Sequence, residues 1–137
     1  MGIEMLLNLE TDYAIRIIDC LAAADKRLDG KTIAAQTGVT QRFSLKILHR
    51  LVSSDLVKSY KGTKGGYVLA RPADEITLLE VVEKMSGDLA FCKCEGEIGH
   101  CTNPQGICRF HAVFDEVSNN VRDSLRKVTF DNKTIKE

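Results

Sequence analysis

The sequence predicts a mainly helical fold that carries one small β-hairpin. Over most of the 137 residues, apolar side chains recur at steps of three and four, which is the spacing of one helix face. One segment, 56–72, departs from this spacing and holds glycines between two short apolar runs. A last periodic segment, 109–128, is the longest. A chain of this length forms one domain, or one small domain with an assembly element.

The first predicted helix covers residues 12–24. Its inward face consists of Ala14, Ile17, Ile18 and Leu21. Thr11 is expected to cap this helix, because a threonine side chain accepts a hydrogen bond from a first-turn amide. Asp12 suits the positive end of the helix dipole. The segment that follows, 25–30, is predicted to be a loop.

Two helices joined by a tight turn come next. The short helix 31–37 ends at Gly38, and Thr40 caps a third helix over 41–55. This order is the signature of a helix-turn-helix, in which the first turn of the second helix enters the DNA major groove. The alternative is an ordinary helical hairpin with a solvated basic face. The inward face of the third helix is predicted to contain Leu45, Leu48, Leu51 and Val52.

The start of the third helix offers side chains suited to reading base edges. The candidates are Gln41, Arg42, Phe43, Ser44 and Lys46. Glutamine and arginine can make bidentate contacts to bases, and serine can donate or accept. Phe43 has two interpretations, a contact with a thymine methyl group or a role in anchoring the helix.

Segment 56–72 predicts strand, turn and strand, with Pro72 ending the second strand. Its glycines permit the positive φ that a tight turn needs. The tip carries Lys61, Thr63 and Lys64. A basic hairpin directly after a helix-turn-helix is typical of a wing that reaches a neighbouring phosphate or the minor groove. The alternative is a surface hairpin whose lysines protect its edge. Residues 1–88 are thus predicted to form a winged helix-turn-helix domain.

The charge distribution supports a nucleic-acid partner. The whole chain has a formal net charge of zero, yet 31–71 holds eight basic residues and one acid, a net charge of +7. This asymmetry indicates one face built for phosphate.

No apolar run reaches the roughly 20 residues of a membrane span, and the N-terminus resembles neither a signal peptide nor a myristoylation site. A cytoplasmic location is therefore expected. No catalytic motif is present, so we expect no enzymatic activity.

A further helix is predicted over 76–87, with Leu78, Leu79, Val82 and Met85 facing the core and Gly87 ending it. A cysteine-rich loop, 89–108, follows it, and then the helix and tail of 109–137. This last helix carries an apolar seam of Phe110, Phe114, Val117, Val121, Leu125 and Val128. The seam predicts pairing with a second helix of a partner chain. The alternative is packing back on the chain's own domain. The tail from Thr129 is polar and predicts no element.

The cysteine loop provides a four-donor set of Cys94, Cys101, Cys108 and His111, with Cys92 as an additional thiol. In a reducing compartment, clustered cysteines bind metal or perform redox chemistry more often than they form disulfides. Three thiolates and an imidazole suit zinc or an iron–sulfur cluster. The spacing leaves both open. A thiol redox protein using Cys92 and Cys94 is the other alternative.

The order of these elements, with the segments DYAIRII and KGTKGGYVLARPADEITLLEVVE and three spaced cysteines, resembles the winged-helix iron–sulfur regulators that include IscR and NsrR. The resemblance covers nearly the whole chain. It implies a homodimer crossed through the C-terminal helix, palindromic double-stranded DNA as partner, and a cluster that changes DNA affinity. Lys61 matches the place of an arginine in the wing of many relatives.

The resemblance also implies ligands. Cys94, Cys101 and Cys108 match the three thiolates of the family. The fourth ligand is His111, as in IscR-like proteins with a [2Fe–2S] cluster, or Asp12 of the partner subunit, as in NsrR-like proteins with [4Fe–4S]. We favour His111 and [2Fe–2S]. The longer loop and the extra Cys92 depart from both patterns and leave open whether Cys92 or Cys94 is the first ligand.

Overall fold

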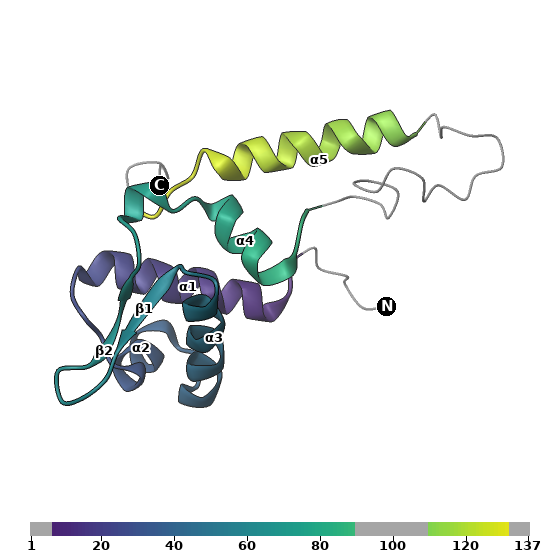
Figure 1. Ribbon diagram of the computed structural model, residues 1–137. Helices are drawn as coiled ribbons and strands as arrows, with labels where there is room; N and C mark the ends of the chain where they lie inside the picture. Colours follow the sequence, from purple (N-terminus) through teal and green to yellow (C-terminus); the bar gives the residue numbers. More distant parts are fainter. Residues whose placement is uncertain (1–6, 90–109, 132–137) are drawn as a thin grey trace.

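The computed structural model describes residues 7–89 and 110–131, and Figure 1 shows their arrangement. The elements are α1 (Leu9–Ala24), α2 (Gly30–Thr37), α3 (Gln41–Ser53), β1 (Val57–Tyr60), β2 (Gly66–Leu69), a 3₁₀ turn (Ala73–Glu75), α4 (Leu78–Ser86) and α5 (His111–Arg126). The prediction of a mainly helical fold with one β-hairpin is confirmed. Within the described residues, no helix has the length and apolar character to cross a membrane.

Helix α1 begins at Leu9 rather than at residue 12, and its cap differs from the prediction. Asn8 caps the helix, since its side-chain oxygen accepts a hydrogen bond from the Thr11 amide at 2.8 Å. Thr11 lies inside the first turn and is fully buried. Its hydroxyl is hydrogen-bonded to that of Ser86, at the end of α4. Thr11 therefore joins two helices instead of ending one.

The helix-turn-helix forms as predicted at its turn. Gly38 has a φ of +73°, a left-handed conformation that glycine adopts without strain. Thr40 caps α3 through a hydrogen bond from the Phe43 amide at 3.3 Å. At the start of α2, the Asp29 carboxylate accepts a hydrogen bond from the Thr32 amide, and this bond lowers the pKa of Asp29. Neighbouring residues thus fix both ends of α2 and the start of α3.

The hydrophobic core lies between α1, α2, α3 and α4. Its largest fully buried side chains are Ile17, Ile18, Ile33, Ile47, Leu48, Leu51, Leu56, Ile76, Val57, Val81 and Val82. The prediction that Leu45 faces inward is wrong, because Leu45 is 43% exposed. Ser44, Ile47 and Leu51 follow one another at steps of three and four residues and form the buried face of α3. Leu45 is turned by about 100° from Ser44 around the helix axis, and it therefore lies beside this face, next to Gly30.

The wing is an antiparallel pair of β1 and β2, extended by a segment that precedes the helix-turn-helix. Leu28 pairs with Tyr67 through two backbone hydrogen bonds, of 3.1 and 2.8 Å. Gly66 has a φ of +140°, and a Cβ at this position would lie 2.7 Å from the Leu28 carbonyl oxygen. The close approach of the two backbones therefore requires a glycine.

The end of α5 is fixed to the winged-helix body. The Leu78 amide donates to the Val128 carbonyl at 2.8 Å, and the Phe130 amide donates to the Ala73 carbonyl at 3.1 Å. Phe130 is 7% exposed and belongs to the core. The tail from Thr129 thus contributes a core residue, although its polar sequence predicted no element. In α4, Val81 is a further missed core residue, while Leu79, Val82, Met85 and the C-terminal Gly87 agree with the prediction.

Candidate nucleic-acid interface

The start of α3 presents three predicted readout side chains to solvent. Gln41, Arg42 and Phe43 are exposed there. The Phe43 ring packs edge-on against Tyr13 of α1, with ring centroids 6.0 Å apart, and still remains 43% exposed. One side of this ring therefore anchors the helix, and the other side is open to a ligand. Both interpretations of Phe43 are compatible with this geometry.

Ser44 does not belong to the exposed surface. Its side chain is fully buried, and its hydroxyl donates to the Val39 carbonyl at 3.4 Å. Position 44 lies on the same helix face as Ile47 and Leu51. The structure therefore corrects the prediction that Ser44 contacts DNA: this serine closes the turn between α2 and α3.

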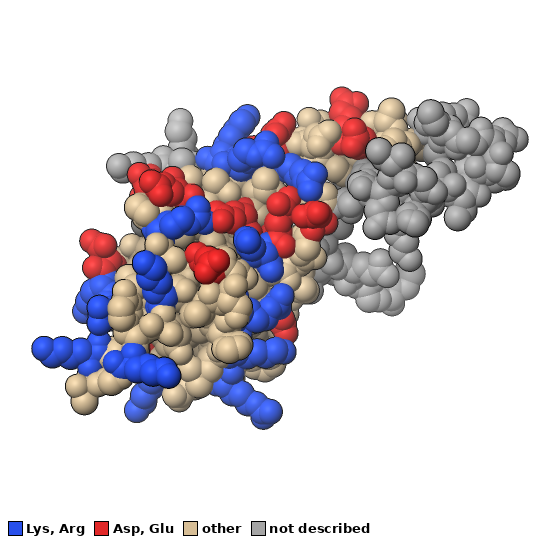
Figure 2. Space-filling model, in the orientation of Figure 1, with Lys and Arg blue, Asp and Glu red and all other residues tan. Residues whose placement is uncertain are grey.

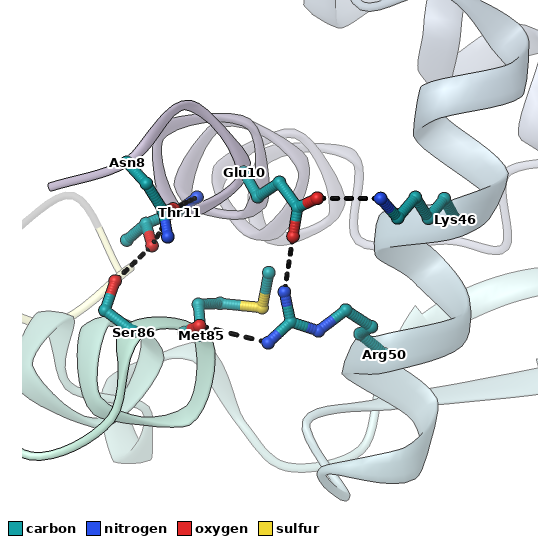
Figure 3. A network of polar contacts seen from close by, with 7 residues as sticks. All are labelled: Asn8, Glu10, Thr11, Lys46, Arg50, Met85 and Ser86. Atoms are coloured by element: carbon teal, nitrogen blue, oxygen red, sulfur yellow. Dashed lines mark hydrogen bonds and ion pairs between the residues drawn. The ribbon is translucent and has the colours of Figure 1, made fainter.

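Lys46 is exposed but already has an acidic partner (Figure 3). Its ammonium lies 2.8 Å from one oxygen of Glu10, and the Arg50 guanidinium lies 2.5 Å from the other. Arg50 also donates to the Met85 carbonyl at 3.0 Å. The hydrogen bond from Lys46 is the main cause that lowers the pKa of Glu10. Through Glu10 and Arg50, helix α3 is joined to α1 and to the end of α4.

The wing tip places three exposed polar side chains at the end of the hairpin: Lys61, Thr63 and Lys64. Gly62, with a φ of +98°, and Gly65 form the turn, in which the Gly65 amide donates to the Gly62 carbonyl at 2.9 Å. Figure 1 shows the hairpin projecting from the helical body on the same side as α2 and α3.

Arg27 is a basic residue of this region and belongs to segment 25–30, for which the sequence predicted only a loop. Its guanidinium carbon lies 3.7 Å from the centre of the Tyr60 ring, and it donates to the Lys64 carbonyl at 3.3 Å. The only sequence signal was a basic residue before the buried Leu28. This residue can be connected with the wing only when the pairing of Leu28 with Tyr67 is known.

Charge is distributed unevenly over the surface (Figure 2). In this view, the end of the molecule that holds the wing and the helix-turn-helix shows mainly lysine and arginine side chains, whereas acidic and basic side chains are mixed nearer α4 and α5. This agrees with the net charge of +7 in 31–71. The end with the readout helix and the wing is thus the one suited to phosphate.

The predicted thiolate ligands Cys92, Cys94, Cys101 and Cys108 lie outside the described residues. His111 is described: it is the first residue of α5 and is half-buried. Asp12 lies on α1 and forms an ion pair with Arg16 at 3.0 Å, with half of its side chain exposed. Among the described residues, no three metal-ligating side chains come together.

A helix-turn-helix with exposed Gln41 and Arg42, followed by a lysine-tipped hairpin, defines the class of winged-helix DNA-binding regulators. The family comparison specifies the class further. The model of the Rrf2 family, described as an iron-dependent transcriptional regulator, matches residues 7–132. The chain belongs to the Rrf2 family.

The relatives agree with this assignment. Protein aau3 of Rhizobium meliloti (strain 1021) is 34% identical over 129 residues, which cover 93% of this chain and 83% of that protein. The regulator NsrR of Oceanobacillus iheyensis is 29% identical, over 80% of this chain and 76% of its own. Among solved structures, IscR of T. potens is similar with a TM-score of 0.71 and 22% identity, over 95% of this chain and 85% of that one.

Some relatives are longer than this chain, which spans 55% of two HTH-type regulators of Mycobacterium tuberculosis. The resemblance to the group of IscR and NsrR is confirmed, and so is the winged-helix fold. The protein is a transcriptional regulator and not an enzyme.

Proposed function

We propose that the protein is a homodimer that binds palindromic double-stranded DNA and that an iron–sulfur cluster controls its affinity. The observation that carries the DNA part is that Arg42 and the wing lysines are exposed on two elements, α3 and the hairpin, that extend on the same side of the helical body (Figure 1). Arg42 and Gln41 would read base edges in the major groove, and Lys61 and Lys64 would bind phosphates. Because chromosomal DNA is the proposed partner, we expect the protein in the cytoplasm.

Helix α5 supports the proposal of a dimer. Its exposed apolar side chains include Val113, at 54%, and Val121, at 37%. In Figure 1, only the later part of α5 lies near α4, and its start extends away from the winged-helix body. A second α5 would remove this apolar surface from water. The proposed organisation is a DNA-binding domain of 1–88, a cluster-binding loop of 89–108, and a dimerisation segment of 109–137.

The donor set supports a cluster. The three thiolates of Cys94, Cys101 and Cys108, with the imidazole of His111, fit a [2Fe–2S] cluster. His111 follows Cys108 by one helical turn of sequence, so it needs little additional ordering to join the set. Asp12 would first have to leave its ion pair with Arg16. A bound cluster would supply a redox-active and oxygen-sensitive group, and its loss would change the loop that leads into α5.

Zinc fits the same donors as an iron–sulfur cluster. The metal and sulfide content of the purified protein distinguishes the two. Protein purified without oxygen should be brown and contain iron and acid-labile sulfide. Colourless protein with stoichiometric zinc would contradict the cluster. In anaerobic reconstitution, Cys94→Ala, Cys101→Ala and Cys108→Ala should each abolish the cluster, while Cys92→Ala should retain it. A full cluster in Cys94→Ala with loss in Cys92→Ala would reverse that assignment.

The fourth ligand is tested by comparing His111→Ala with Asp12→Ala in Mössbauer spectra. Changed spectra in His111→Ala alone support His111. Changed spectra in Asp12→Ala alone would move the ligand to Asp12 and favour a [4Fe–4S] cluster. The regulatory part is tested by the affinity of cluster-loaded and apo-protein for a duplex selected from a randomised library. Equal affinity in both forms would contradict control by the cluster.

A further inference from the structure

We propose that Arg27 is a positioning residue that holds the wing against the helical body, so that the wing lysines meet phosphates in a fixed orientation. This inference rests on the proposed DNA binding and adds to it a residue that lies outside both the helix-turn-helix and the hairpin. Arg27 belongs to the segment between α1 and α2, far from the wing in sequence.

Two contacts of one side chain carry the proposal. The guanidinium carbon of Arg27 lies 3.7 Å from the centre of the Tyr60 ring, so cation and ring are in direct contact. One guanidinium nitrogen donates to the Lys64 carbonyl at 3.3 Å. Tyr60 is the last residue of β1, and Lys64 lies in the turn before β2. Arg27 therefore contacts the end of β1 and the turn that follows it, which together form the tip of the hairpin.

The backbone beside Arg27 is itself fixed. Leu28 is 5% exposed and shares two hydrogen bonds with Tyr67, of 3.1 and 2.8 Å. This bridge fixes the start of β2 but does not include the turn, 61–65. Within the described part of the chain, the Arg27 side chain joins that tip to the helical body. Next to the hydrogen-bonded backbone of Leu28, the Arg27 side chain thus reaches the turn of the hairpin.

The chemistry of this contact requires an arginine. A planar guanidinium can lie on an aromatic face and still donate hydrogen bonds from its edge, which a lysine ammonium cannot do in the same fixed geometry. Both partners are exposed, with Tyr60 at 41%, so the contact is a modest one. An exposed cation–π contact corresponds to a factor of about 2 to 5 in an equilibrium constant.

The first test measures the wing without DNA. Amide hydrogen exchange of 61–65 is compared in the full-length protein and in the variants Arg27→Ala, Tyr60→Ala, Tyr60→Phe and Lys26→Ala. Arg27→Ala and Tyr60→Ala should accelerate exchange about 2- to 5-fold, because each removes the contact. Tyr60→Phe keeps the ring and should have no effect. Lys26→Ala removes the same charge at the adjacent exposed position and is the matched control.

The second test measures binding to a random-sequence duplex and to a duplex selected from a randomised library. Arg27→Ala should weaken binding to both about 2- to 5-fold, Lys26→Ala should weaken it less, and Arg27→Lys should not restore it. The double variant Arg27→Ala/Tyr60→Ala should bind no more weakly than the weaker single variant, because both remove one interaction.

Unchanged exchange in Arg27→Ala would overturn the proposal. Equal weakening by Arg27→Ala and Lys26→Ala would also overturn it, since Arg27 would then act only as a charge near phosphate. Additive losses in the double variant would exclude a shared role with Tyr60. If the wild-type protein bound neither duplex, the proposed DNA binding would fail, and the exchange data would still show whether Arg27 holds the wing.

Discussion

Replacing Glu10 by glutamine should strengthen DNA binding. The Glu10 carboxylate lies 2.8 Å from the Lys46 ammonium on the readout helix and 2.5 Å from the Arg50 guanidinium. The Lys46 side chain is 58% exposed, so it is accessible to DNA but neutralised by its neighbour. Glutamine has nearly the same size and removes the charge. Arg50 keeps its hydrogen bond to the Met85 carbonyl, which holds the helix in place.

The size of the effect follows from counterion release. If Lys46 gains a phosphate, each subunit makes one more contact, and the slope of log affinity against log salt becomes steeper by about 0.9. Lowering salt from 1 M to 0.1 M should then raise the affinity of Glu10→Gln by an additional factor of about 8 per subunit. Random and selected duplexes should respond alike, because a phosphate contact carries no sequence information.

The assay is a salt titration of binding by fluorescence anisotropy, with Glu83→Gln as matched control. Glu83 also pairs with an arginine, Arg122, at 3.2 Å, but it lies on α4 and pairs with α5. Its substitution makes the same change in net charge away from the readout helix. An equal gain in both variants would mean that only total charge matters. An unchanged slope in Glu10→Gln would show that Lys46 does not reach phosphate.

The pH dependence provides a second check on the same contact. The pKa of Glu10 is lowered from its ordinary value of 4.5, mainly by the hydrogen bond from Lys46. A lowered carboxyl pKa stabilises the folded state at pH above the ordinary value, and this stabilisation is lost as pH falls through the lower folded value. The difference in unfolding free energy between wild type and Glu10→Gln should therefore be constant near neutral pH and vanish in acid. A difference that persists in acid would contradict the assignment.

Three further predictions concern recognition, core and wing. Arg42→Ala should cost about 1–3 kcal/mol, mostly on the selected duplex, and an unchanged ratio of selected to random binding would exclude Arg42 as a base reader. Leu51→Ala should lower the free energy of unfolding in urea by about 2–5 kcal/mol, because Leu51 is fully buried, and a loss below this range would contradict its place in the core. Gly66→Ala should destabilise the fold more than Gly62→Ala, since a Cβ at Gly66 meets the Leu28 carbonyl oxygen at 2.7 Å while one at Gly62 meets nothing within 4 Å; equal losses in thermal unfolding would contradict the close approach.

Features fixed by neighbouring residues could be predicted from the sequence. The turn at Gly38 and the cap at Thr40 depend on residues within four positions, and both are confirmed. The error at Thr11, by contrast, has a long-range origin. Asn8 and Thr11 are both good caps, and the choice depended on the contact between Thr11 and Ser86, which are 75 residues apart.

The buried face of helix α3 was harder to predict than the length of the helix. Leu45 and Ser44 are adjacent, and residue type alone favours burying the leucine. The structure does the reverse, because Ile47, Leu48 and Leu51 define the buried face and Ser44 shares it. A buried serine is tolerated because its hydroxyl donates to the Val39 carbonyl. A partner five residues away in a turn leaves no periodic signal in the sequence.

The basic residues in 31–71 could be counted from the sequence, but the sequence does not show which of them are available to bind phosphate. Within the described part of the chain, ion pairs to Glu10 and Glu80 engage Lys46, Arg50 and Arg71, which are three of the eight basic residues. The two acids lie outside the segment, so its net charge of +7 overstates what faces DNA. The five remaining bases are Lys31, Arg42, Lys58, Lys61 and Lys64. The share of the wild-type salt dependence that comes from 31–71 should therefore reflect at most these five bases per subunit, and Glu10→Gln should add Lys46 to them.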